Sequence, residues 1–306
     1  MKKHNENKKG ETIFNRSGKW FSFFVLIIPL IIWVLSYIGA NYFWVEQAFV
    51  STNTEGAKSF TLVYFERFFV EIFAPDTVLN VAFVNTLKYW LLGIVKTFLA
   101  LFVSYFLFKK VAFSKVYTII MMLPGIIAGT VYISIFKNLF VTYGPVWIFL
   151  NDVFGIDMQY PFSSSVLATP FILFYTLWCG FGSTLLIYVG VMNRIPGEVL
   201  EAAKLDGCGW FREFWSIIFP FTWATFTTFF ITCFTGMFMS TGPILLFTGT
   251  NEYFKTYTLN FYIYVQVLNG QQNFASAMGL IIGVVTIPVV FLSRWLMNKY
   301  QSELQF

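Results

Sequence analysis

The chain has 306 residues, of which 57% are hydrophobic and only 11% are charged, and its mean hydropathy is +0.68. A soluble domain carries roughly 25% charged residues, so this composition excludes a water-soluble globular protein and indicates a membrane protein. The net charge is +5, but the basic residues cluster at the ends of apolar runs, which favours topology signals over nucleic-acid binding.

Six apolar runs are long enough to cross a bilayer as helices, which takes about 20 residues each. In chain order they are Trp20–Tyr42, Val81–Phe108, Lys115–Phe136, Val166–Met192, Ile217–Phe247 and Ala275–Met297. The first run is too long for the apolar part of a signal peptide and lacks a clear cleavage site after it, so we expect it to be retained. The sequence therefore predicts an all-α membrane protein with six transmembrane helices.

The predicted organisation has one long core and two tails. Its parts are an N-terminal tail (1–19), a first transmembrane helix (20–42), an external loop (43–80), a core of five transmembrane helices (81–297) that contains a cytoplasmic loop (193–216), and a C-terminal tail (298–306). The external segments, about Phe43–Asn80 and Lys137–Ser165, are long enough for short interfacial helices.

Lys and Arg residues predict the orientation. With six crossings, the tails and the loops after the second and fourth runs fall on one side and hold most of the basic residues, whereas the opposite segments hold a majority of acids. By the positive-inside rule, both termini are expected to be cytoplasmic.

The densest mixed-charge segment, PGEVLEAAKLDGCGWFREFWSIIFP, lies between the fourth and fifth runs, from Pro196 to Pro220. Glu198 and Glu201 are acids near the positive N-terminus of a new helix. Gly207 and Gly209 interrupt that helix. We therefore expect a first short amphipathic helix that ends in a glycine bend on the cytoplasmic side.

A second amphipathic pattern follows the bend. Its bulky apolar residues recur at one to four spacing and place Arg212 and Glu213 away from the centre of the apolar stripe. Two interpretations of the helix pair stand side by side: a pair that lies on the lipid headgroups, and an element that fills a groove on a soluble partner.

This segment resembles the EAA signature of the inner-membrane permeases of ATP-binding-cassette importers. The matching positions are Glu201, Ala202, Ala203, Gly207, Ile217 or Ile218, and Pro220. Phe219 stands where Leu is commoner, and Cys208 stands where a small residue is usual. Further segments resemble the carbohydrate-importer subset: FVNTL at Phe83–Leu87, MMLPGIIAGTVYISIFKNLF at Met121–Phe140, YGPVWIFLNDVFGID at Tyr143–Asp157 and NFASAMGL at Asn273–Leu280.

The resemblance implies a type I importer permease whose EAA helix is a coupling helix seated in a cleft of a cytoplasmic ATPase. It implies that Glu201 bonds to the ATPase, that Ala202 and Ala203 let the helix seat closely, and that Gly207 gives the bend. Asp206 and Pro220 belong to the same element. The implied partners are a second homologous permease, an ATPase dimer, an extracytoplasmic solute-binding protein, a sugar and membrane lipid, and the implied location is a bacterial cell membrane.

Motifs for catalysis or metal binding are not found. The chain has no G-x-x-x-x-G-K-[ST], no G-x-S-x-G and no H-E-x-x-H, so we expect a non-catalytic subunit without a cofactor. Its three cysteines, Cys179, Cys208 and Cys233, form no close pair, and His4 is the only histidine. A metal site or a disulfide framework is therefore not expected.

The predicted spans hold almost no acids, which disfavours a cation path and favours a neutral, hydroxyl-rich solute. Lys96, about halfway along the second run, is a functional candidate, although it can also snorkel or bond to the carbonyl groups of a helix end. The other candidates for the solute path are Tyr175, Trp178, Thr235, Gly236, Ser240 and Thr241. For these, ordinary helix packing is the alternative.

Three other functions are alternatives to a sugar-importer permease. The first keeps the architecture but changes the solute to glycerol phosphate, a polyamine or a peptide-like molecule. The second is an autonomous secondary transporter, which would have inverted repeats or paired broken helices; neither is visible here. The third is a membrane-embedded enzyme, which the missing catalytic motifs disfavour.

Overall fold

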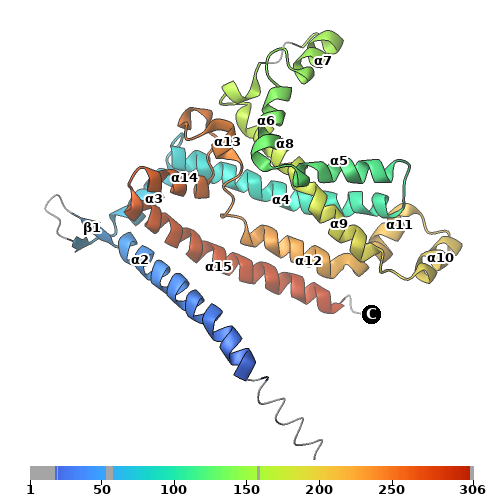
Figure 1. Ribbon diagram of the computed structural model, residues 1–306, viewed down its shortest axis with the longest axis horizontal. Helices are drawn as coiled ribbons and strands as arrows, with labels where there is room; N and C mark the ends of the chain where they lie inside the picture. Colours follow the sequence, from blue (N-terminus) through green and yellow to red (C-terminus); the bar gives the residue numbers. More distant parts are fainter. Residues whose placement is uncertain (1–17, 19, 53–57, 157–158, 304–306) are drawn as a thin grey trace, which may run out of the picture.

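The fold is helical almost throughout the described residues, which in this computed structural model are 18, 20–52, 58–156 and 159–303 (Figure 1). The predicted N-terminal tail and His4 lie outside them, except for Gly18. Among these described residues, five helices are long and apolar enough to cross a membrane: Trp20–Ala48, Val78–Phe108, Ala168–Met192, Trp210–Thr235 and Gln272–Lys299. They overlap the predicted first, second, fourth, fifth and sixth runs.

The core of the bundle is built on α4 (Val78–Phe108), which packs against α9 (Phe181–Met192) and α12 (Phe219–Thr235). The C-terminal helix α15 (Gln272–Glu303) lies along α12, and these four helices run side by side in Figure 1. Buried apolar side chains of α4, α9 and α12 form one continuous cluster. Packing of these apolar faces fixes the relative positions of the helices, because lipid tails provide no hydrophobic driving force between them.

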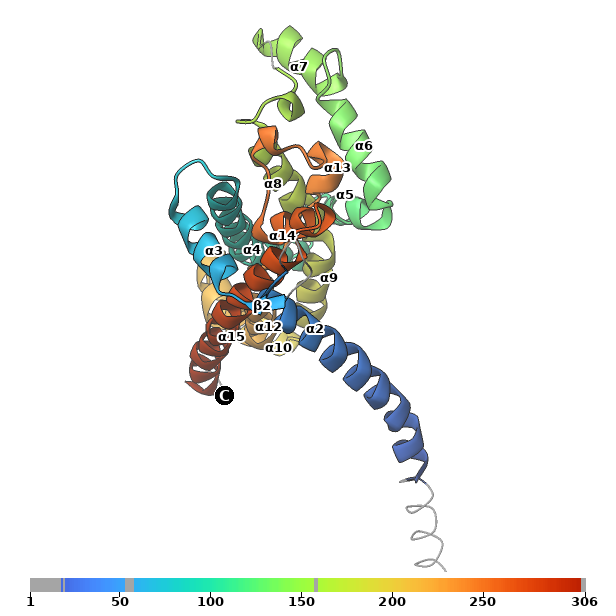
Figure 2. The same ribbon diagram turned by 90° about the vertical axis from the view of Figure 1, so that its left-hand side faces the viewer.

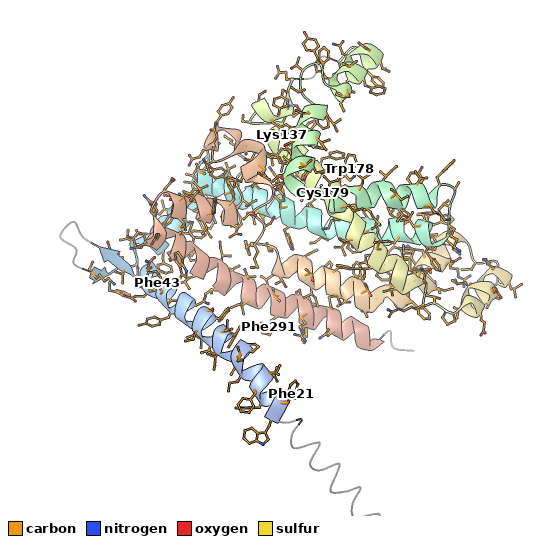
Figure 3. The ribbon with its side chains drawn as sticks, viewed as in Figure 1. Phe21, Phe43, Lys137, Trp178, Cys179 and Phe291 are labelled. Atoms are coloured by element: carbon orange, nitrogen blue, oxygen red, sulfur yellow. The ribbon has the colours of Figure 1, made fainter. Side chains whose placement is uncertain are left out.

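The first helix stands apart from this core. Its last turns form α2 (Gly39–Ala48), which touches α15, whereas the rest splays away in both views (Figures 1 and 2). Figure 3 shows Phe43 near the end of the first helix that touches α15, and Phe21 near its opposite end; both side chains are exposed. The predicted boundary at Tyr42 is too early, since the helix continues to Ala48.

The run predicted as a span over Lys115–Phe136 is not one continuous helix. This run forms α5 (Ser114–Ile126) and α6 (Gly129–Leu139), which are bent by 114° relative to one another. Residues Ile127 and Ala128 between them have extended backbone. Pro124, which lacks an N–H, and the nearby glycines weaken the helix at this point. An apolar run alone does not report such a break.

Both long connecting segments contain a short helix, as predicted. The first holds α3 (Val63–Phe73), and the second holds α7 (Pro145–Phe154) followed by a 3₁₀ turn at Pro161–Ser163. The first segment also forms an unpredicted antiparallel hairpin of β1 (Val50–Thr52) and β2 (Lys58–Phe60). In Figure 1, α3 and the hairpin lie at the end of the bundle opposite to α10 (Gly197–Leu205).

The fifth predicted run, Ile217–Phe247, is not one helix, and α12 ends at Thr235. The chain then turns through Gly242 into α13 (Ile244–Thr248), and a 3₁₀ turn at Glu252–Phe254 leads to α14 (Leu259–Leu268). Gly242 has φ +57°, and a Cβ there would lie 3.0 Å from the Tyr89 hydroxyl oxygen. Both the positive φ and this close approach favour glycine.

Candidate functional site

The charged segment forms α10 and α11 (Trp210–Glu213) at one end of the bundle, next to the end of α4 (Figure 1). The prediction of a second separate short helix is wrong, because α11 continues through a π-helical turn at Phe214–Ile218 into α12. Pro220 crowds the carbonyl of the residue four positions earlier, Ser216, which lies inside this wider turn.

The bend after α10 is a Schellman motif. Gly207 has φ +69°; its N–H donates to the Lys204 carbonyl at 3.1 Å, and the Cys208 N–H donates to the Ala203 carbonyl at 2.9 Å. A left-handed residue after the helix C-cap, usually glycine, permits both bonds. The last carbonyl groups of α10 are thereby satisfied without a partner protein, so the helix end is formed in the isolated chain.

The outward face of α10 is fully exposed. Glu201, Ala202 and Asp206 are exposed, whereas Ala203 is buried. Leu205 is 89% exposed, the largest exposure among the large apolar side chains described. Sequence reasoning missed Leu205, although its position four residues after Glu201 places both side chains on one helix face. The face thus presents the Glu201 carboxylate beside an unpacked leucine.

Glu213 differs from its prediction. It was expected off the centre of an apolar stripe, but its residue exposure is only 3%. Its Oε1 lies 2.5 Å from Nζ of Lys109, the residue that follows α4. A buried carboxylate needs such a partner, and the partner comes from a distant part of the chain. The pattern of neighbouring residues therefore gave no signal for it.

The candidate path residues on α8 (Ala168–Cys179) lie in a packed aromatic region. The Tyr175 ring lies 5.1 Å from that of Phe136 and 5.0 Å from that of Phe247, so α8 meets the segment just after the fifth-span break. The Trp178 ring is edge-on to Tyr132, and its buried Nε1 has no hydrogen-bond acceptor among the described residues. Figure 3 places Trp178 where α8 meets α9. The indole N–H of Trp178 thus has no acceptor, whereas the Tyr175 ring packs against neighbouring aromatic rings.

The break after α12 carries the remaining candidates. The Thr235 hydroxyl donates to the Ile231 carbonyl at 3.1 Å, and Gly236 caps α12. The Ser240 carbonyl accepts a hydrogen bond of 2.7 Å from the Thr258 hydroxyl. Thr241 lines an open groove of about 440 Å³ together with Gly242, Pro243, Leu245, Leu246, Phe261 and Tyr264. Thr241 is thus the candidate that this groove includes.

Lys96 is half-buried in the middle of α4 and faces the junction of α8 and α9. A Cβ on Gly180, the C-cap of α8, would lie 2.9 Å from Lys96 Nζ. A helix C-terminus carries partial negative charge that favours a cation. No carboxylate forms an ion pair with Lys96 within the part of the chain that the structure describes. Its position therefore fits the helix-end alternative.

Across the described residues, no cluster of three His, Cys, Asp or Glu side chains is arranged to hold a metal.

Comparisons with known proteins agree with this architecture. The maltose/maltodextrin transport system permease protein MalF of Yersinia pestis is 26% identical over an alignment of 204 residues, and the match covers 62% of this chain and 37% of MalF. MalF of Salmonella typhimurium is 30% identical over 170 residues, which are 55% and 32% of the two chains. The matched residues thus span about a third of the length of these relatives.

Two solved structures share the fold. A chain of a bacterial transporter that imports the acidic polysaccharide alginate superposes with a TM-score of 0.76 at 19% identity, and the match covers 94% of this chain and 98% of that one. The same type of transporter in complex with an alginate pentasaccharide-bound periplasmic protein gives a TM-score of 0.74. Residues 91–304 match the family described as "Binding-protein-dependent transport system inner membrane component". The expected family is therefore confirmed: this chain is a multi-pass membrane protein that belongs to the inner-membrane components of binding-protein-dependent transport systems.

Proposed function

We propose that this chain is one permease subunit of an ATP-driven importer that carries a saccharide across a bacterial cell membrane. The family match over residues 91–304 supports transport, and the maltodextrin permeases among its relatives support a saccharide as the solute. The observation that carries the proposal is α10, an exposed helix at one end of the bundle with a free Glu201–Leu205 face.

In this proposal α10 seats in a cleft of a separate cytoplasmic ATPase. Leu205 fills an apolar pocket there, and the Glu201 carboxylate accepts hydrogen bonds from the ATPase. Ala203 already packs on the bundle, so α10 cannot shift without moving the residues below it. Asp206 and Gly207 fix the end of the helix, and Pro220 begins the span that receives the movement.

The orientation and the partners follow from the same proposal. Both termini lie in the cytoplasm on the side of α10, and α7 faces outward toward an extracytoplasmic solute-binding protein. The apolar first helix, exposed along most of its length, lies against lipid or against a second homologous permease. Two permease subunits enclose the path, and an ATPase dimer supplies the energy.

The solute path runs along α8 and the break after α12. The unpaired Trp178 Nε1 can donate a hydrogen bond to a sugar hydroxyl, and exposed Thr235 and Thr241 offer hydroxyl groups. Tyr175 lines one side of the path with its packed aromatic ring, and Gly236 and Ser240 lie in the non-helical segment after α12. Lys96 keeps an acidic saccharide as the second candidate solute, because it is a half-buried cation near the middle of α4.

The test compares Glu201→Lys with Glu66→Lys, a matched reversal at an exposed acid in the first turn of α3, at the other end of the bundle. We expect the unmodified chain and Glu66→Lys to co-purify with an ATPase that carries the phosphate-binding loop, and to take up labelled oligosaccharide. Glu201→Lys should insert in the membrane but lose uptake. Wild-type uptake in Glu201→Lys, or co-purification with no ATPase, would contradict the proposal.

A further inference from the structure

A buried ion pair joins the end of α4 to the first turn of the helix that follows α10. Lys109 Nζ lies 2.5 Å from Glu213 Oε1, and the exposed fractions of the two side chains are 30% and 4%. The angles at Oε1 are not those of a hydrogen bond, so the contact is an ionic one. The other ion pairs of the described residues leave their carboxylates between 26% and 87% exposed. The Lys109–Glu213 pair is therefore the one whose carboxylate depends on its partner.

The pair also complements two helix ends. Lys109 is the C-cap of α4, where the helix dipole favours a cation, and Glu213 lies in the first turn of α11, where it favours an anion. Loss of Lys109 leaves the buried Glu213 carboxylate uncompensated, which costs more than the pair itself contributes. The two helix ends are thus held near one another by an ionic contact whose loss is unfavourable.

Aromatic packing surrounds the ion pair on the same two elements. The Tyr105 hydroxyl donates to the Trp210 carbonyl at 3.3 Å, which ties α4 to the first residue of α11. The Phe214 ring lies 5.4 Å from that of Tyr105 and 5.7 Å from that of Phe102. The last two turns of α4 therefore pack against the residues that directly follow the α10 bend.

Only a short connection separates α10 from these contacts with α4. Asp206 is the C-cap of α10 and Gly209 is the N-cap of α11, so a displacement of α10 is passed to Glu213 through a few residues. From there two routes lead into the bundle: the covalent one through α12, and the non-covalent one through Lys109 into α4. The second route moves the helix that carries Lys96.

We propose that Lys109 and Glu213 are positioning residues that transmit movement of α10 to α4, so that α4 and α12 shift together when the ATPase acts. This inference rests on the proposed function, since it takes an ATPase on α10 as the source of movement. Without the pair, α12 still follows α10 through the chain, whereas α4 does not.

The test reads the two routes separately with single cysteines in a chain whose three native cysteines are replaced by serine. Val95→Cys reports on α4 and Thr232→Cys reports on α12, and both positions are exposed. Maleimide labelling rates are measured in the assembled complex in liposomes, with and without MgATP and vanadate. In the background chain, we expect nucleotide to change the rate at both positions.

Glu213→Gln, which keeps the size of the side chain, should abolish the nucleotide-dependent change at Val95→Cys and keep it at Thr232→Cys. Lys109→Met should do the same, and Lys109→Arg should restore the response at Val95→Cys. Glu46→Gln, which breaks the exposed Lys58–Glu46 pair of 3.3 Å, is the matched control and should change neither response. A merely stabilising pair would instead affect both positions alike or neither.

The outcomes separate this inference from the proposed function. If neither position responds to nucleotide in the background chain, the proposed function fails. If both respond and Glu213→Gln leaves the response at Val95→Cys intact, only the inference is overturned. Should the single variants not accumulate, the double variant Lys109→Met, Glu213→Leu leaves no unpaired buried charge and carries the same test.

Discussion

At the scale of single residues, chemistry that looks alike in the sequence has different roles in the structure. Glu201 and Glu213 both belong to the charged segment, yet one is exposed and the other is buried against Lys109. Tyr175 and Trp178 are three residues apart, yet Tyr175 packs among aromatic rings whereas Trp178 keeps an unpaired donor. Burial and partners, rather than residue type, decide which side chain is available to a ligand.

The prediction at this scale concerns the role of Lys96. Its ammonium group lies beside the C-cap of α8, so Lys96→Met should lower stability by about 0.3–1 kcal/mol, as for a cation at a helix C-terminus. We expect uptake of a neutral oligosaccharide to persist in Lys96→Met and in the control Lys96→Arg. The measurement is uptake of matched neutral and uronic-acid oligosaccharides. Loss of acidic uptake in Lys96→Met alone would instead identify Lys96 as a contact for an anionic solute.

At the scale of elements, close approach of backbones fixes the packing of α5 on α9. A Cβ on Gly182 would clash with the Met121 carbonyl oxygen and lie 2.9 Å from the Met122 Cα. Small residues permit such contacts between membrane helices. The same helix has Gly190, where a Cβ would meet nothing within 4 Å. One helix thus contains a glycine that packing requires and a glycine that it does not.

Gly182→Ala should therefore destabilise the chain by about 1–3 kcal/mol, because the neighbouring atoms are backbone and cannot move aside cheaply. Gly190→Ala is the matched control and should be neutral or stabilising by up to about 1 kcal/mol, since alanine is the better helix former. Thermal unfolding in detergent compares the two. An equal midpoint for both variants would show that the contact between α5 and α9 tolerates a methyl group.

At the scale of the whole molecule, the bundle has two unlike ends. One end holds α10, the end of α4 and the last turns of α15, and the other holds α3, α14 and the hairpin (Figure 1). The proposed topology places the first end in the cytoplasm. The bent pair of α5 and α6, rather than a straight third span, leads to α7, which Figure 2 shows far from the bundle.

An impermeant maleimide can test this topology in intact cells. A chain that keeps only Cys208, which follows α10 and is half-exposed, should be labelled only after the membrane is permeabilised. Asp152→Cys, in α7 and exposed, with the native cysteines replaced, should be labelled in intact cells. Labelling of Cys208 from outside, with Asp152→Cys protected, would reverse the proposed orientation and with it the docking of a cytoplasmic ATPase.

The sequence by itself determined the membrane class, the position of five spans and the short helix that ends in a glycine bend at Gly207. Hydrophobic length and local backbone chemistry suffice for these, because each depends on neighbouring residues. Only the tertiary structure decided the 114° bend after α5, the burial of Glu213 against Lys109 and the place of Lys96 beside Gly180. Each of these depends on how helices pack, through contacts between residues far apart in the chain, which no local pattern specifies.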